Sequence, residues 1–285
     1  MTYGITGNPH KPALWAPLAE LVHALRQRGA AFRLDAPLAA GLAERGLADA
    51  EGTDEIADGA DVLLSFGGDG TMLRTAHRCD GVPILGVNMG RLGFLTKVEV
   101  GELDAVLTRV EAGDYGVEHR MTLSVESDAH LGGVPAWALN DVVADKSGTT
   151  SMIQVEAAVD GRHLNTYWAD GLVIATPTGS TAYALSVGGP ILVPGTDAIV
   201  VAPIAPHTLT ARPIVLPCDA VLDLRVETRD HPFAFACDGV STVLDGGASF
   251  RIQRAERTVQ MVTLPDRDYF GTIRGKLSWG QGGVF

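Results

Sequence analysis

Residues 61–71 read Asp-Val-Leu-Leu-Ser-Phe-Gly-Gly-Asp-Gly-Thr. The apolar run that ends at Phe66 predicts a buried strand, and the glycines after it predict a tight turn into a helix that begins near Thr71. Glycines let backbone N–H groups approach a bulky anion, and the N-terminal end of a helix attracts negative charge. The sequence therefore predicts phosphate contacts from Gly67, Gly68, Gly70 and Thr71.

Asp69 stands out within this glycine loop, because a carboxylate repels a polyphosphate. An acid is expected here only if it removes a proton or holds a metal ion, so the loop indicates phosphoryl chemistry more than passive phosphate binding. Arg74 follows about one helical turn later, and its side chain is expected to reach back toward a phosphate. The alternative is an ordinary turn between a strand and a helix.

Strand-like and helix-like segments alternate in the first part of the chain, residues 1–117. This alternation predicts an α/β domain with a parallel sheet, in which ligands bind at the carboxyl ends of the strands. We expect strands at Tyr3–Gly7, Asp61–Phe66 and Val82–Val87, and helices at Pro12–Arg28, Thr71–Arg78 and Leu103–Ala112.

The pattern changes near residue 118, after which short strands predict a mostly antiparallel, β-rich domain over 118–265. Asp160-Gly161 is a predicted hairpin turn, and one helix is expected around Ser180–Val187. The last stretch, Tyr269–Trp279, fits either domain. The expected strands are Met121–Glu126, Ala136–Ala144, Met152–Val159, His163–Trp168, Ala198–Ala202, Ile214–Leu216, Val221–Glu227, Phe233–Cys237, Ser249–Gln253 and Thr258–Val262.

The net charge of −12 argues against general nucleic-acid binding, because affinity for a duplex depends on neutralising its phosphates. No apolar run approaches the roughly 18–20 residues that cross a bilayer, and the first ten residues lack the charged and apolar regions of a signal peptide. The three cysteines have no metal-ligand spacing, and an odd number argues against a disulfide framework. We therefore expect a cytoplasmic globular protein without a membrane partner.

Two polar segments interrupt the β-rich part. Asn140-Asp141 lies within an apolar strand, where neighbouring side chains point to opposite faces, so both serve one ligand only at a strand end or bulge. A simple turn pair is the alternative. Residues 170–183, Asp-Gly-Leu-Val-Ile-Ala-Thr-Pro-Thr-Gly-Ser-Thr-Ala-Tyr, end a strand with more hydroxyls than a helix cap needs, which favours a loop that grips a ligand. Tyr183 offers a ring for stacking on a base, with a place in the core as the alternative.

A third polar segment, Ala202–Pro213, contains three prolines and predicts an extended loop. His207 lies within it. We expect this histidine to be held by hydrogen bonds rather than to carry protons.

Taken together, these segments resemble the NAD kinase family, within the diacylglycerol kinase/phosphofructokinase-like superfamily. The Gly67–Thr71 element alone is shared with phosphofructokinases and with lipid kinases, but its combination with Asp170–Ser186 is highly specific. The match follows the family's order over most of the chain. Its other motifs are Gly86-Val-Asn-Met-Gly-Arg-Leu-Gly-Phe94, Asn140-Asp141 and Ala205-Pro-His-Thr-Leu209.

The resemblance implies a phosphofructokinase-like N-terminal α/β domain, to which residues 266–285 return, and a β-sandwich-like C-terminal domain. It implies transfer of a phosphoryl group from ATP, with Mg²⁺, to the adenosine 2′-hydroxyl of NAD, giving NADP. It also implies a homodimer or homotetramer. The sequence contains no dedicated metal cage, so the ion is expected to arrive with the nucleotide.

The resemblance also implies roles for single residues. Asp69 would be the general base. The residues implied to bind NAD are Asp69, Gly70, Arg74, Asn140, Asp141, Asp170, Thr181, Ala182, Tyr183, Ala184, Leu185, Ser186 and Ala205. The chain departs from many bacterial members at Ser151 and Trp168, where basic residues often occur.

Two other functions compete with this interpretation. A sugar or lipid kinase would share the glycine loop, but the chain lacks the Thr-x-Asp segment of phosphofructokinases at a comparable place and any greasy segment suited to a lipid. A dinucleotide-sensing regulator would keep the pocket and lose the acid of the glycine loop, whereas Asp69 is present.

Overall fold

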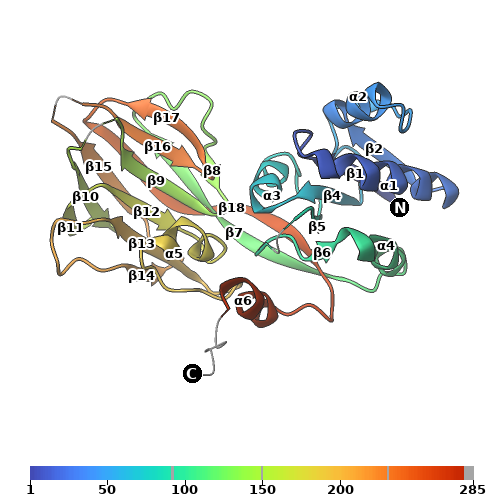
Figure 1. The fold of residues 1–285 in the computed structure, drawn as a ribbon. Coiled ribbons are helices and arrows are strands. Elements are labelled where there is room, and N and C mark those ends of the chain that lie inside the picture. The colour runs from blue at the N-terminus through green and yellow to red at the C-terminus, as the bar shows by residue number, and fades with distance from the viewer. Residues whose placement is uncertain (91–92, 149, 230, 279–285) are drawn as a thin grey trace, which may run out of the picture. The chain divides into compact units, whose positions relative to one another are not determined.

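A computed structural model describes residues 1–90, 93–148, 150–229 and 231–278, and the chain divides into two compact units (Figure 1). Unit 1 contains Met1–His119 and Val259–Phe285, and unit 2 contains Arg120–Thr258. The sequence pattern predicts these boundaries after residues 117 and 265. Two long strands, β7 (Gly116–Ser127) and β18 (Ala248–Thr263), each contain residues of both units.

Unit 1 is built on a parallel sheet with the strand order β5-β4-β1-β2-β3. Its strands are β1 (Thr2–Gly7), β2 (Ala31–Asp35), β3 (Gly52–Thr53), β4 (Val62–Gly67), β5 (Ile84–Asn88) and β6 (Val98–Glu99). Its helices are η1 (Pro12–Leu14), α1 (Trp15–Gln27), α2 (Ala36–Glu44), α3 (Asp69–Ala76), η2 (Val100–Glu102), α4 (Leu103–Glu111) and α6 (Tyr269–Leu277).

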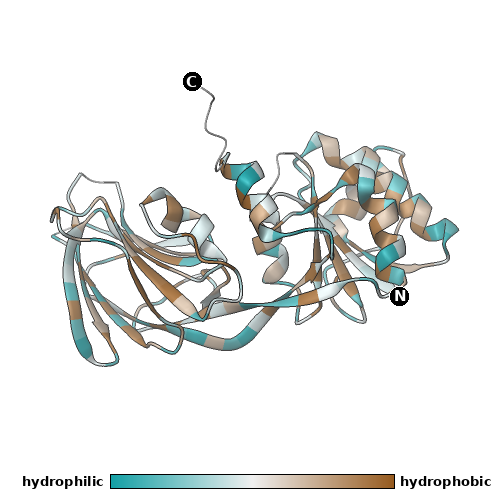
Figure 2. Ribbon diagram, turned by 90° about the horizontal axis from the view of Figure 1, so that it is seen from below, coloured by the Kyte–Doolittle hydropathy of each residue, from teal (hydrophilic) through white to brown (hydrophobic). Residues whose placement is uncertain are grey.

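The core of unit 1 forms because β4 is mostly apolar, is buried over its whole length and lies between two neighbouring strands, β1 and β5. Phe66 of this strand is fully buried and shares one hydrophobic cluster with Leu18 and Val22 of α1. Figure 2 colours the helices of unit 1 in patches of brown and teal, as expected for helices with one buried face. The carboxyl end of β4 thus presents the glycine loop from a rigid support.

Unit 2 consists of two sheets whose inner faces form one core. One sheet has the order β14-β13-β12-β9-β16-β17, and the other has β11-β10-β15-β18, with β7 pairing β18 and β8. Phe235 of the first sheet stacks on Phe250 of the second at 4.1 Å between ring centroids. The remaining elements are β8 (Trp137–Ala138), β9 (Asp141–Lys146), β10 (Ile153–Val159), β11 (Arg162–Ala169), β12 (Gly171–Ala175), η3 (Gly179–Thr181), α5 (Tyr183–Ser186), β13 (Ala198–Ile204), β14 (Ile214–Pro217), β15 (Leu222–Glu227), β16 (Phe233–Cys237) and β17 (Val240–Leu244).

The predicted fold class, an α/β domain followed by a mostly antiparallel, sandwich-like domain, is confirmed. Three elements are divided or joined differently from expectation. The single predicted strand over Ala136–Ala144 is broken between β8 and β9, the two expected strands after Ser249 are one strand, β18, and the helix expected around Ser180–Val187 is divided at Ala182 into η3 and α5. Residues 31–44, for which no element is expected from the sequence, form β2 and α2.

A second, smaller apolar cluster positions α5 in unit 2. Ala184 of this short helix is fully buried and packs, with Val187 and Leu192, against residues of β9, β12 and β13 such as Val173 and Val200. The middle of each of these three strands is therefore apolar on both faces. The loop that precedes α5 is consequently fixed against the sheet. Among the described residues, no helix is both long and apolar enough to cross a membrane.

Candidate functional site

The predicted site residues form one cluster in each unit, and each cluster is described by itself. The glycine loop of unit 1 joins β4 to α3. Gly68 is the N-cap of α3, and the N–H groups of Thr71 and Met72 donate to its carbonyl oxygen at 2.9 Å and 3.1 Å. The helix therefore begins at Asp69, two residues earlier than expected. Asp69 thus lies in the first helical turn, where the helix dipole stabilises a carboxylate.

The carboxylate of Asp69 is held in one orientation by two backbone donors. The Phe94 N–H donates to Oδ2 at 2.9 Å and the Leu95 N–H to Oδ1 at 3.0 Å. The Nζ atom of Lys276 lies 3.7 Å from Oδ2, and 30% of the Asp69 side chain remains exposed. The acid is therefore fixed and still accessible. Phe94 belongs to the predicted motif Gly86–Phe94, of which residues 91 and 92 lie outside the described part of the chain.

The glycines of the loop differ in what surrounds them. A Cβ atom on Gly67 would overlap the side chain of Thr71, so the fold itself requires glycine there. A Cβ atom on Gly68 or Gly70 would meet no atom of the described chain within 4 Å, and neither residue has a positive φ. The fold thus gives no steric reason for these two glycines. The open space beside them is where a phosphate would approach the backbone.

This contrast predicts opposite effects for two alanine substitutions. Gly70→Ala should leave the free energy of unfolding unchanged or raise it by up to about 1 kcal/mol, because alanine is the better helix former. It should nevertheless weaken the binding of a nucleoside triphosphate at least tenfold if the phosphate lies where the sequence predicts it, because the methyl group would fill the open space beside Gly70. Urea unfolding and calorimetric titration with ATP measure the two effects.

Gly67→Ala is the matched control, since its methyl group overlaps Thr71 and should lower the free energy of unfolding. Unchanged triphosphate affinity in Gly70→Ala would mean that the open space beside Gly70 is not the phosphate site.

The side chain of Arg74 extends back toward the first turn of its own helix, α3. Its Nη2 atom donates to Oγ1 of Thr71 at 3.2 Å, and the side chain is exposed. The guanidinium therefore lies next to the glycine loop, as the spacing of one helical turn predicts.

In unit 2, the Asn140-Asp141 pair is organised by Asp238, an aspartate that is not among the predicted site residues. The backbone N–H groups of Leu139 and Asn140 donate to the Asp238 carboxylate at 2.7 Å each, and that of Asp141 donates at 3.3 Å. Three successive N–H groups bound to one side chain cannot pair with a neighbouring strand, which explains the break between β8 and β9. The available signal was the turn dipeptide Asp238-Gly239, whose aspartate has a φ of 49°.

The threonine-rich loop is bound directly to this pair. The Thr176 N–H donates to the carbonyl oxygen of Asn140 at 2.9 Å, and the Thr176 hydroxyl donates to that of Leu139 at 2.5 Å. A Cβ atom on Gly179 would overlap the backbone of Asn140, so only glycine permits this approach. The structure therefore brings together two segments that are about forty residues apart in the sequence.

Carboxylates accumulate where this loop meets the sheet. The Tyr183 N–H donates to Asp141, and the Tyr183 hydroxyl bonds with Asp145. Lys146 forms an ion pair with Asp170 at 2.8 Å from Nζ to Oδ1. Burial raises the pKa of Asp141 to about 7, and the nearby charge of Asp238 adds to the effect. Burial likewise raises the pKa of Asp145 and of the Tyr183 hydroxyl.

The raised pKa of Asp141 predicts a pH-dependent stability. Between about pH 4 and pH 7 the folded state keeps a proton that the unfolded state has lost, so the free energy of unfolding falls as the pH rises through this range. Asp141→Asn should remove this fall in the free energy of unfolding. The variant should therefore be more stable than the parent at pH 8, by up to about 4 kcal/mol, and should have nearly the same free energy of unfolding as the parent at pH 4. Urea unfolding at pH 4, 6 and 8 measures the difference.

Asp219→Asn is the control, since this aspartate is exposed in the same unit and its replacement should not change the pH profile. A parallel pH profile for Asp141→Asn and the parent would mean that Asp141 is ionised throughout.

The other predicted residues of unit 2 lie around this cluster. Thr181, Ala182 and Leu185 are half-buried, Tyr183 is 37% exposed, and Ser186 is exposed. The Ala184 side chain is fully buried, so only its backbone is available to a ligand.

Ala205 has a φ of 41° and is exposed. It follows Ile204, whose carbonyl oxygen accepts the Asp170 N–H at 3.0 Å, so Ala205 lies next to Asp170. His207 is held through its backbone N–H, which donates to the carbonyl oxygen of Trp168 at 2.8 Å.

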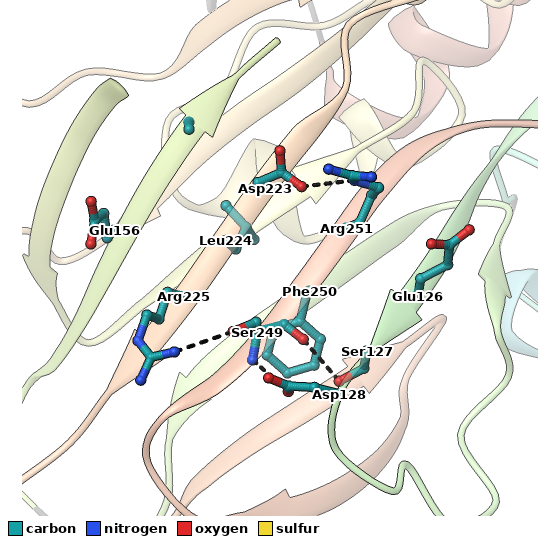
Figure 3. A pocket seen from close by; sticks show the side chains of 11 residues that line it. Glu126, Ser127, Asp128, Glu156, Asp223, Leu224, Arg225, Ser249, Phe250 and Arg251 are labelled. Carbon is teal, nitrogen blue, oxygen red and sulfur yellow. Dashed lines mark hydrogen bonds and ion pairs between the residues drawn. The ribbon is translucent and has the colours of Figure 1, made fainter. Parts of the chain in front are cut away.

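Figure 3 shows a different hollow in unit 2, formed by β7, β10, β15 and β18. Charged side chains line it, with Arg251 paired to Asp223 at 2.8 Å from Nε to Oδ1. None of the predicted site residues borders this hollow. Over the described ranges of the chain, no group of three or more His, Cys, Asp or Glu residues is arranged to hold a metal ion.

Comparison with known proteins identifies the family of each part of the chain. The ATP-NAD kinase N-terminal domain model matches residues 43–115, and the ATP-NAD kinase C-terminal domain model matches residues 139–264. A NAD kinase of Bacteroides fragilis is 46% identical over 224 residues, which are 78% of this chain and 77% of the relative. A NAD kinase of Geobacter metallireducens is 39% identical over 276 residues, which are 95% of this chain and 96% of the relative.

Solved structures agree with the fold. Yeast NADH kinase, in a crystal structure with NADH, has a TM-score of 0.89 at 24% identity and covers 99% of this chain and 88% of its own. A NAD kinase from Archaeoglobus fulgidus, in complex with ATP, has a TM-score of 0.75 at 25% identity and covers 96% of this chain and 99% of its own. With a matched domain in each unit and identity that extends over nearly the whole chain, this protein is a phosphotransferase that belongs to the NAD kinase family.

Proposed function

We propose that this protein transfers the terminal phosphoryl group of ATP to the adenosine 2′-hydroxyl of NAD, giving NADP, with Asp69 as the general base. The observation that carries the proposal is the Asp69 carboxylate, which is fixed by two backbone N–H groups and stays partly exposed beside an open glycine loop. The relatives named NAD kinase support NAD as the acceptor, and the NAD kinase of Archaeoglobus fulgidus was solved in complex with ATP.

Asp69 would accept the proton of the attacking hydroxyl. Each oxygen of its carboxylate accepts one backbone N–H and has further lone pairs for the hydroxyl. The two bonds prevent rotation of the carboxylate, so the base is oriented before the substrate binds. General-base catalysis of this kind contributes about 10²–10⁴-fold to the rate.

The glycine loop would bind the phosphates of ATP. Gly68 and Gly70 leave space for them, the first turn of α3 presents N–H groups, and Arg74 adds a positive charge at the same helix end. We assign the phosphate contacts to Gly67, Gly68, Gly70 and Thr71, as the sequence predicts. Mg²⁺ would enter as part of the MgATP substrate, since the described residues offer it no cluster of ligands, and would offset charge on the phosphates.

The cluster around Asp141 would bind NAD. The Oδ1 atom of Asn140 is buried and has no hydrogen-bond partner among the described residues, so it is available to an N–H donor such as the amino group of adenine. Asp141 and Asp170 supply acceptors for ribose hydroxyls, and Tyr183 offers an exposed ring. We assign the remaining contacts to Thr181, Ala182, Ala184, Leu185, Ser186 and Ala205.

One assay tests this proposal against its alternatives. The purified protein is incubated with MgATP and, in separate reactions, NAD, NADH, fructose 6-phosphate or diacylglycerol, and the phosphorylated product is identified by mass spectrometry. NADP from NAD is the expected product. A phosphorylated sugar or lipid in its place would identify one of the competing kinases, and NAD binding without turnover would identify a regulator.

Substitution of Tyr183 tests the NAD side of the site. Tyr183→Ala should weaken NAD binding about tenfold or more, because a stacked base is worth about 1–3 kcal/mol. Tyr183→Phe keeps the ring, loses the hydroxyl bond to Asp145, and should change the affinity less than threefold. Calorimetric titration with NAD measures both; equal losses in the two variants would assign the effect to the hydroxyl group rather than the ring.

The resemblance also motivates proposals on assembly and location. We propose a homodimer or homotetramer in the cytoplasm, to be tested by light scattering of the purified protein and by cell fractionation.

A further inference from the structure

The last helix in the described part of the chain, α6, places a lysine beside the glycine loop. Nζ of Lys276 lies 3.7 Å from Oδ2 of Asp69 and 5.2 Å from the centre of the Phe94 ring. The Phe94 N–H itself donates to Asp69. The ammonium group is therefore located by two neighbours that belong to the same cluster, although Lys276 and Asp69 are more than two hundred residues apart in the sequence.

The helix that holds Lys276 is itself anchored in unit 1. The Asp268 carboxylate caps its first turn by accepting the Gly271 N–H at 2.5 Å, and Thr272 and Ile273 are buried. Lys276 lies in the last turn, where the helix dipole stabilises a cation. The position of the ammonium group thus follows from a packed helix and not from a free tail.

The pair with Asp69 is poorly explained by a contribution to folding. About a third of each side chain is exposed, and exposed ion pairs contribute little because water screens them. The separation of 3.7 Å is longer than a charge-assisted hydrogen bond, so the ammonium group keeps N–H donors for another acceptor. An accessible cation with available donors, placed beside an open glycine loop, matches the needs of a phosphate.

We infer that Lys276 binds the terminal phosphoryl group of ATP and offsets its repulsion from Asp69. This inference rests on the proposed function. During transfer, the bond between the ribose 2′-oxygen and phosphorus forms, the bond between that phosphorus and its bridging oxygen breaks, and the hydroxyl proton passes to Asp69. The ammonium group stays protonated throughout and acts only by its charge and its N–H donors.

The inference is tested with three substitutions at Lys276 in the full-length protein. Lys276→Ala and Lys276→Met should each lower kcat/KM for ATP at least thirtyfold, and Lys276→Met keeps the apolar stem against Phe94. Lys276→Arg restores the charge and should recover activity to within about tenfold of the parent. The affinity for NAD alone, measured by calorimetry, should change less than twofold, which a general loss of structure would not allow.

Arg274→Ala is the matched control, because this exposed residue lies two positions earlier on α6 and therefore on the other side of the helix. It should leave kcat/KM for ATP within twofold. If Lys276→Met keeps kcat/KM for ATP within threefold of an active parent, the inference is overturned while the proposed function stands. A parent that forms no NADP would instead overturn the proposed function first.

Discussion

Replacing Asp69 with asparagine is expected to lower the turnover number by about 10²–10⁴-fold while NAD affinity stays within several-fold. An amide does not accept the hydroxyl proton, so the chemical step loses its base. The loss should appear in kcat rather than in binding, since the proposed NAD contacts are otherwise unchanged. Initial rates of NADP formation and calorimetric titration with NAD measure the two quantities.

The hydrogen bonds of Asp69 add a structural cost to this substitution. Both carboxylate oxygens accept backbone N–H groups, whereas asparagine places its own NH₂ donors against one of them. The free energy of unfolding should therefore fall by about 1–3 kcal/mol. Urea unfolding shows whether the variant is folded under assay conditions. A folded variant that turns over within tenfold of the parent would exclude Asp69 as the base.

Gly179→Ala is expected to lower both the stability of unit 2 and the affinity for NAD. The new methyl group overlaps the backbone of Asn140, and the loop from Thr176 to Ser186 must move away from the sheet to admit it. Overpacking of this kind costs about 1–3 kcal/mol of stability. Because the same movement separates Tyr183 from Asp141, NAD affinity should fall at least tenfold.

Gly133→Ala provides the comparison within unit 2, since a Cβ atom there meets nothing within 4 Å and the residue has no positive φ. Gly133→Ala should change the free energy of unfolding by no more than about 0.5 kcal/mol, and it should leave the NAD affinity unchanged. Gly179→Ala with the NAD affinity of the parent would show that the contact between the loop and Asn140 is irrelevant to binding.

The local part of the fold was predictable because it depends on residues that are neighbours in the sequence. The apolar run before Gly67 gives a strand between two others, and the glycines after it give the turn into α3. Likewise, alternation forbids Asn140 and Asp141 from facing the same side within a continuous strand, and the structure places them where the strand is interrupted.

Two residues of the site, which the sequence did not indicate, contact partners far away in the sequence. Asp238 binds three N–H groups almost one hundred residues earlier, and Lys276 reaches Asp69 from α6. Neither residue lies in a pattern that differs from an ordinary turn or an amphipathic helix end. Their roles depend on sheet pairing and helix packing, which local propensity does not specify.

The division of the chain has a consequence for biosynthesis. Unit 2 is inserted within unit 1, so the ribosome completes Arg120–Thr258 before it makes β18's last residues and α6. Translation proceeds at roughly 5–20 residues per second, so many seconds pass between synthesis of the glycine loop and synthesis of Lys276. The nascent chain therefore exposes Asp69 without its Lys276 neighbour until α6 has been made, and under the proposed role of Lys276 products truncated before α6 would have low activity.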